Sequence, residues 1–359
     1  MAAQVISRTR SATPSDLAAL VTLEELCFDG DRISRRQFRH LLTQANASIT
    51  VVERNGDLIG DVVVLFNRAT SVARLYSIAV SPCARGLGIA RALVEAAEMA
   101  AWGRGRPWMR LEVRKDNAAS MSLFESLGYH RFGQYPDYYA DHADAWRYEK
   151  ILNPALRPHL AKIAYYRQSL DFTCGAAALM MALHALDPAV PLERRLEIQL
   201  WREATTIFMT SGHGGCGPYG LALAAASRGF RVEVHVSSTG VHLVESVRDA
   251  RKKAVMHLVQ DDMEDQLSEL GVPIHEREIS LDEVRARFDA GALPLALISS
   301  WQIYEARVPH WVLITGFDDQ FVYMHDPFVD ADNGETETDS MHTPIAHDTF
   351  RRMARYGRQ

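Results

Sequence analysis

Residues 75–103, LYSIAVSPCARGLGIARALVEAAEMAAWG, decide the fold of the first part of the chain. An apolar stretch typical of a strand (75–80) leads through a short loop into a helical pattern that begins at residue 89. Gly86 and Gly88 remove side chains where the backbone must turn tightly before that helix. Because backbone amides at a helix start point outward, this order of elements predicts a site for a diphosphate.

The patterns on either side extend this α/β unit over residues 1–152. Two prolines in ILNPALRPHL (151–160) interrupt both periodicities, so we expect a linker at 153–160 and a second domain at 161–359. The first unit contains further helical and strand patterns. The expected helices are 17–28, 35–44 and 117–128, and the expected strands are 47–54, 60–67 and 108–113.

The first part resembles the GNAT acetyltransferases, whose motif of Arg or Gln, two residues, Gly, one residue, then Gly or Ala is met by Arg85, Gly88 and Ala90. The stretch LEVRKDNAASMSLFESLGY (111–129) is similar to the branch that acetylates alanine of ribosomal proteins. The resemblance implies a mixed, largely antiparallel sheet with flanking helices, and acetyl-CoA as cofactor. It also implies coenzyme contacts, from the backbone of Ile78, Ala79 and Val80, from Arg85, Gly86, Leu87, Gly88, Ile89, Ala90 and Arg91, and from Asn117.

By the same resemblance, Glu112 lies where that branch keeps its general base. The family commonly has a tyrosine as general acid at the position of Phe124, and phenylalanine has no proton to donate. We therefore expect acetyl-CoA binding, with turnover depending on another tyrosine. The candidates are Tyr129, Tyr138 and Tyr139.

The second part reads as an α+β domain, because helical patterns come first and strand patterns last. The expected helices are 174–186, 192–204, 220–229, 241–254 and 259–270, and the expected strands are 230–237, 293–299, 310–317 and 321–326.

Within RQSLDFTCGAAALMMAL (167–183), Cys174 falls in the first turn of a helix that Thr173 can cap. The helix dipole there favours the thiolate, which is the nucleophilic form of cysteine. Gln168 is positioned to donate to an oxyanion. The small residues 175–177 are expected to leave room for a substrate backbone.

A general base for Cys174 is expected in the hairpin PHWVLITGFDDQFVYMHDPF (309–328). Folding it at residues 318–319 brings Asp326 opposite His310 or one diagonal step away, where a carboxylate can orient the imidazole. His325 points to the other face and is expected at the surface or behind the site. A lone cysteine in an apolar helix is usually a packing residue, but the four residues together favour catalysis.

This half resembles the papain-fold cysteine peptidases that process bacteriocin leaders after a double glycine. The resemblance makes Gln168 the oxyanion donor, Cys174 the nucleophile, His310 the base and Asp326 its orienting partner. The membrane spans and ATPase of the exporters are not found in this sequence. The sequence thus predicts a bifunctional enzyme that acts on a peptide or protein, with cleavage exposing an amine for acetylation.

Two alternatives stay open. The same thiol would serve amide transfer or isopeptide cleavage, and the first unit could sense acetyl-CoA without turning it over. His213 and Cys216 lie in a glycine-rich loop, but two residues do not close a zinc site, so no metal site is predicted.

The amino-acid composition narrows the classes of partner and the compartment that we expect for the protein. The net charge of −6 lacks the basic excess of a nucleic-acid binder. No apolar run is long enough for a membrane helix, and no signal peptide is evident, so we expect a cytoplasmic protein. The four cysteines do not suggest a disulfide framework. The oligomeric state is not indicated.

Overall fold

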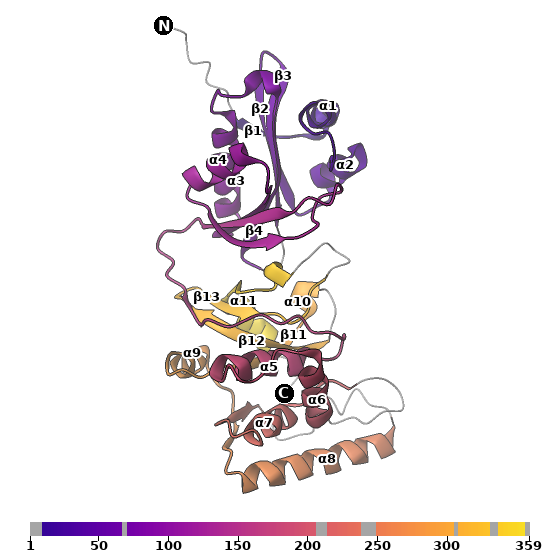
Figure 1. Cartoon of the computed structure of the whole chain (residues 1–359), viewed down its shortest axis with the longest axis vertical. Helices are drawn as coiled ribbons and strands as arrows, with labels where there is room; N and C mark the ends of the chain where they lie inside the picture. Colours follow the sequence, from indigo (N-terminus) through magenta and orange to yellow (C-terminus); the bar gives the residue numbers. More distant parts are fainter. Residues whose placement is uncertain are drawn as a thin grey trace. The chain divides into compact units, whose positions relative to one another are not determined.

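The computed structural model describes residues 9–66, 70–205, 214–237, 249–304, 308–330 and 337–355. The chain divides into two compact units, Met1–Leu156 and Arg157–Gln359 (Figure 1).

The described part of the first unit is built on one seven-stranded sheet in the order β1-β2-β3-β4-β5-β7-β6. Neighbouring strands are antiparallel except β4 and β5, which α3 connects in parallel. The sheet is therefore mixed and largely antiparallel. Its strands are β1 (Thr9–Ser11), β2 (Ala47–Arg54), β3 (Asp57–Phe66), β4 (Val72–Val80), β5 (Trp108–Arg114), β6 (His130–Tyr135) and β7 (Ala145–Ile151).

Helices cover both faces of this sheet, because alternate strand residues point to opposite sides. Val51 packs in the core beneath α1 and α2, whereas its neighbour Val52 packs in the core beneath α3 and α4. The helical elements are η1 (Pro14–Asp16), α1 (Leu17–Cys27), α2 (Arg35–Thr43), η2 (Pro82–Ala84), α3 (Ile89–Gly103) and α4 (Ala118–Ser126).

Strands β4 and β5 separate along their length. They pair from Val72 opposite Trp108 to Leu75 opposite Leu111, although β4 continues to Val80. Tyr76 is the extra residue of a β-bulge against β3 and marks the point of separation. Beyond it, the edge of β4 that faces β5 has no strand partner among the described residues.

The described sheet of the second unit is antiparallel, in the order β11-β12-β13-β14, with β8 pairing to β12. Since β8 falls inside the predicted linker 153–160, the end of that segment is part of a sheet instead. The strands are β8 (His159–Leu160), β11 (Leu295–Ser299), β12 (Pro309–Phe317), β13 (Phe321–His325) and β14 (Thr343–Ala346).

Helix α5 is the centre of the second unit, and ten of its residues are buried. It packs against Trp311 and Leu313 of β12 on one side and against α6 and α7 on the other (Figure 1). A close approach of α7 to the end of α6 requires Gly220, because a Cβ there would lie 2.4 Å from the carbonyl oxygen of Ala204. These helices are α5 (Cys174–Leu186), α6 (Arg194–Ala204) and α7 (Pro218–Ala226).

The remaining described elements lie around these layers. Strands β9 and β10 form a separate two-stranded parallel sheet beside α7 and α8. The elements are β9 (Val234–Val236), α8 (Ala250–Glu269), β10 (Ile274–Glu276), α9 (Leu281–Asp289), α10 (Trp301–Tyr304), η5 (Glu337–Asp339) and α11 (His347–Ala354).

Two expectations for this region are wrong. The helices predicted at 241–254 and 259–270 are one helix, α8, as far as the described residues show; residues 241–248 lie outside them. Met256, Met263 and Leu267 are buried along one uninterrupted helical face, which leaves no reason for a break. The strand predicted at 230–237 shortens to the three residues of β9.

Candidate active sites

The glycine loop between β4 and α3 has the conformation its sequence predicts. Gly86 and Gly88 adopt φ values of +78° and +79°, which favour glycine, and Gly88 caps α3. The side chains of Arg85, Leu87 and Arg91 are exposed around the loop, whereas Ile89 is buried in the core. The helix start therefore presents its amides to solvent beside the unpaired edge of β4, which carries Ile78, Ala79 and Val80. This arrangement fits a pantetheine arm and a pyrophosphate.

Asn117, the remaining residue implied in coenzyme binding, caps α4. Its Oδ1 accepts a hydrogen bond from the backbone N–H of Ser120 at 3.0 Å. Asn117 is exposed, so the same side chain still has its amide group at the surface.

Glu112 is held by two arginines. Its carboxylate accepts from Arg74 Nε at 2.9 Å on one oxygen and from Arg147 Nε at 3.1 Å on the other. The Glu112 side chain is 5% exposed, and that of Arg147 is fully buried. Both oxygens of the carboxylate are thus hydrogen-bonded, and the assignment of Glu112 as general base stays a prediction.

The three candidate tyrosines differ in their surroundings, and Tyr139 is half-buried with its ring centroid 5.0 Å from that of Tyr138. Tyr129 is buried against Phe124 and donates its hydroxyl to Met109 Sδ, which leaves it no path to a substrate. Tyr138 accepts a hydrogen bond from Arg74 Nη2 at 2.6 Å and so shares that arginine with Glu112. Burial, followed by the charge of Glu112, raises the pKa of Tyr138 to about 12, which keeps its proton in place at neutral pH.

In the second unit, Cys174 is the first residue of α5, after Thr173 at the N-cap. The structure brings it together with His310 and Asp326. His310 Nε2 lies 2.5 Å from Asp326 Oδ1, and both side chains are less than a tenth exposed. Since Asp326 occupies Nε2, the nitrogen of His310 left for the thiol is Nδ1.

The pKa values of Cys174 and His310 are shifted so that the charged forms of both side chains are favoured. Burial alone would raise the pKa of the Cys174 thiol, but the hydrogen bond and charge of His310 lower it overall. Burial alone would lower the pKa of His310, but Asp326 and then Cys174 raise it to about 10. Both shifts favour a thiolate beside an imidazolium, which is the reactive state of a catalytic cysteine.

Gln168 lies in the segment that approaches Asp326. Its backbone N–H donates to the carbonyl oxygen of Pro327 at 2.9 Å, and its Nε2 donates to the carbonyl oxygen of Leu170 at 2.9 Å. One amide hydrogen of Nε2 remains for an oxyanion. A cavity of about 440 Å³ borders Gln168 and is lined by Tyr165, Tyr166, Arg167, Gln168, Ser169 and Glu337.

The sequence interpretation missed Glu197. This fully buried residue of α6 accepts from the backbone N–H of Ser169 at 2.8 Å and from Thr173 Oγ1 at 2.5 Å. It also accepts from Ser169 Oγ at 2.6 Å and from Tyr166 Oη at 3.0 Å. A glutamate in an amphipathic helix is normally predicted to lie at the surface, so the sequence pattern does not predict that Glu197 accepts these buried hydrogen bonds.

The expected clearance around residues 175–177 is wrong. Ala176 and Ala177 are fully buried, because α5 passes through the middle of the unit. A Cβ on Gly175 would lie 2.9 Å from Cys216 Cβ and 3.0 Å from Trp311 Cδ1, so protein fills that space. These small residues allow close packing and leave no groove for a substrate.

Two other sequence expectations concern this region. Cys216 is buried beside Gly175, and burial raises the pKa of its thiol, which makes it an unreactive packing residue. His213 lies outside the described residues. His325 is fully buried, not at the surface, and its Nε2 lies 3.2 Å from the carbonyl oxygen of Ile163.

Two family models match the chain. Residues 17–129 match the Acetyltransferase (GNAT) family and residues 163–359 match the Peptidase_C39 like family. The fold and the sites thus define a GNAT acetyltransferase domain followed by a peptidase-like domain. The chain belongs to the Peptidase_C39 like family, whose model covers more than half of it, and through its first unit to the GNAT acetyltransferases.

Individual relatives match parts of the chain. An acetyltransferase from Pectobacterium atrosepticum is 32% identical over 120 residues, which are 32% of this chain and 81% of the relative. An uncharacterised protein from Mycobacterium leprae is 32% identical over 145 residues, or 37% of this chain. The chain spans only 38% of that protein's length.

Among solved structures, the ribosomal-protein-S18-alanine N-acetyltransferase from Escherichia coli is 26% identical, with a TM-score of 0.38. The similarity covers 42% of this chain and 96% of that one. None of the helices described here has the length and apolar character to cross a membrane.

Proposed function

We propose that the chain is a bifunctional enzyme, an acetyl-CoA-dependent N-acetyltransferase joined to a papain-like cysteine peptidase that acts on a peptide or protein. The contact of Cys174 with the His310–Asp326 pair carries the peptidase part of this proposal. The glycine loop beside the unpaired edge of β4 supports the acetyltransferase part. The cytoplasm is the expected compartment.

In the proposed peptidase reaction, Cys174 Sγ attacks the carbonyl carbon of the scissile amide, and the C–N bond breaks as a thioester forms. His310 gives its proton to the departing amine. Water then hydrolyses the thioester, releases the new carboxylate and restores the thiol. Gln168 Nε2 donates to the oxygen that carries negative charge in both steps.

In the proposed acetyltransferase, acetyl-CoA supplies the activated acetyl group when it is bound. The edge of β4 at Ile78, Ala79 and Val80 would receive its pantetheine arm, and the glycine loop would offer amides to its pyrophosphate. Tyr138 is the tyrosine best placed to replace the acid that Phe124 lacks, because it is protonated and shares Arg74 with Glu112.

The test is mass spectrometry of a peptide library incubated with the full chain, with and without acetyl-CoA. We expect wild type to cleave peptides and, with acetyl-CoA, to add one acetyl group to the new amines. Cys174→Ala should abolish cleavage yet still acetylate amines that are supplied directly. Cys216→Ala is the matched control, because it removes a buried cysteine of the same unit that lies outside the proposed catalytic group.

Equal cleavage by wild type and Cys174→Ala would refute the peptidase. Cleavage without any acetyl gain across the library would refute the acetyltransferase and leave the first unit as a sensor. A labelled amine in the mixture separates hydrolysis from amide transfer, since transfer would place the label on the acyl fragment.

A further inference from the structure

Three potential metal ligands meet on the small parallel sheet of the second unit. His235 of β9 lies directly opposite His275 of β10. Opposed residues of neighbouring strands point to the same face, and so do residues two apart on one strand. Glu233, two residues before His235, therefore joins the two histidines on one face.

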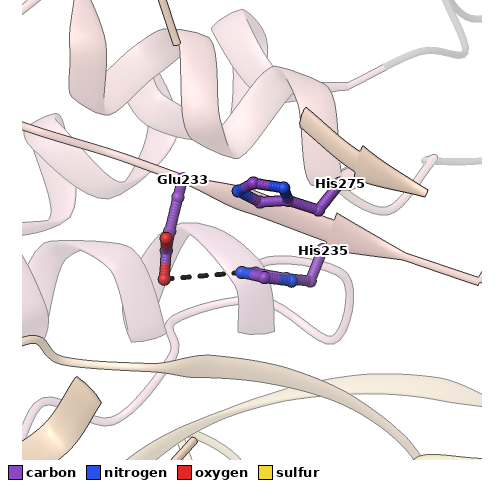
Figure 2. Close-up of side chains that lie close together, drawn as sticks. All are labelled: Glu233, His235 and His275. Carbon is purple, nitrogen blue, oxygen red and sulfur yellow. Dashed lines mark ion pairs between the residues drawn. The ribbon is translucent and has the colours of Figure 1, made fainter. Parts of the chain in front are cut away.

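The side chains converge as this register requires. The ring centroids of His235 and His275 lie 4.6 Å apart, and His235 Nε2 lies 3.4 Å from Glu233 Oε1. One ligand atom from each of the three residues falls within 4.8 Å of the others. Figure 2 shows both imidazoles extending toward the Glu233 side chain, with the ion pair between His235 and its carboxylate drawn as a dashed line.

The buried histidine of this group has no hydrogen bond. The His235 side chain is 10% exposed, and neither of its ring nitrogens has a hydrogen-bond partner among the described residues. Buried polar groups are normally satisfied, and leaving one unsatisfied costs about 1 to 3 kcal/mol. An imidazole that is nine-tenths buried, has no hydrogen bond among the described residues and lies against a second imidazole and a carboxylate points to a missing ligand.

We propose that Glu233, His235 and His275 bind a divalent transition-metal ion of the zinc type. Two imidazoles and one carboxylate form a donor set that suits Zn²⁺ and related first-row ions, whereas Mg²⁺ and Ca²⁺ prefer oxygen ligands throughout. Three protein ligands leave a coordination position for water. The ion would cross-link β9 and β10.

Arg287 fits this site as the residue that orients the carboxylate. Its Nε donates to Glu233 Oε1, the same oxygen that lies 3.4 Å from His235 Nε2, so Oε2 would be the oxygen that binds the ion. A carboxylate can bind a metal through one oxygen and accept a hydrogen bond on the other, and such outer partners commonly fix metal ligands.

The ion would stabilise the small parallel sheet. β9 and β10 have three residues each and form a sheet of two strands, which is marginal on its own. Their other face is covered, because Val234 and Val236 pack with Met263 and Leu267 of α8. A metal ion would hold the two strands together through the opposite face.

The test is titration of the full-length protein, freed of metal by a chelator, with Zn²⁺ by calorimetry and with Co²⁺ by visible absorption. All variants carry Cys174→Ala so that this thiol cannot bind the ion. We expect His275→Ala to bind one equivalent of Zn²⁺ fewer than the parent. His257→Ala is the matched control, because it removes an exposed histidine of α8.

Glu233→Gln provides a second variant at an exposed position, where the fold is little affected, and should weaken binding about tenfold or more. Circular dichroism establishes that each variant is folded. The proposal is wrong if the parent, His275→Ala and Glu233→Gln bind Zn²⁺ with equal stoichiometry and affinity. A site that takes Mg²⁺ or Ca²⁺ and not Zn²⁺ would also overturn it.

Discussion

At the scale of single residues, Asp326 decides which nitrogen of His310 faces Cys174. Its Oδ1 lies 2.5 Å from His310 Nε2 and also accepts from the backbone N–H of Phe328 at 2.9 Å. The carboxylate is thereby fixed, and its charge stabilises the imidazolium. Cys174 in turn loses its proton more easily, because the positive ring lies beside it.

This arrangement predicts a pH dependence for alkylation of Cys174. The lowered pKa of Cys174 means that its thiolate exists below the ordinary value of 9.0, and His310 stays protonated up to about 10. We expect iodoacetamide to modify Cys174 with a midpoint below pH 9.0 in wild type. Without the imidazole, burial and the charge of Asp326 both raise the pKa of Cys174, opposed by the backbone of Trp311, so His310→Ala should move the midpoint above pH 9.0.

The modification is measured by mass spectrometry of the peptide that contains Cys174, which separates it from the exposed Cys83. His257→Ala should leave the midpoint unchanged. A common midpoint for wild type and His310→Ala would show that the imidazole does not act on the thiol.

At the scale of elements, helix α6 fixes the segment that carries Gln168 and leads to Cys174. The carboxylate of Glu197 accepts four hydrogen bonds, from Tyr166, Ser169 and Thr173. Those bonds hold the turn before α5 in one conformation. A buried carboxylate with four donors is stabilised by them, and a weaker acceptor would satisfy less well the donors that surround it, among them the hydroxyl of the fully buried Thr173.

We therefore expect Glu197→Gln to lower the free energy of unfolding by about 1 to 3 kcal/mol, because an amide cannot accept all four bonds. Glu203→Gln on the same helix is the control. Its carboxylate lies at the surface beside Arg228, where an ion pair is worth about 0 to 1 kcal/mol. Urea unfolding measures both, and equal losses in the two variants would contradict the role of Glu197.

Local sequence patterns predicted most helices and strands, but they did not predict every contact between side chains. The helix predicted at 174–186 is α5 to the residue, because its apolar, alanine-rich composition acts within the segment itself. The roles of Glu197, His235 and His275 could not be predicted, since each depends on a partner that is distant in the sequence. The predicted role of residues 175–177 failed because burial depends on the neighbours of α5 and not on its own composition.

At the scale of the whole molecule, each unit has apolar cores of its own. We expect calorimetry of the full chain to show two unfolding transitions. Acetyl-CoA at about a hundred times its Kd should stabilise only the first unit, by about 2.7 kcal/mol. Cys174→Ala should leave this stabilisation by acetyl-CoA unchanged. An equal shift of both unfolding transitions would contradict binding of acetyl-CoA to the first unit alone.

The β-bulge in β12 has a consequence for how the second unit could change over time. Leu313 pairs with His325, but Gly316 pairs with Tyr323, so Thr315 is an extra residue between them. A bulge holds one extra residue without shifting the pairs on either side of it. Deleting Thr315 would therefore leave Leu313 opposite His325 and Asp326 beside His310, so the loss of that one codon would straighten the strand without exchanging the acid of this pair.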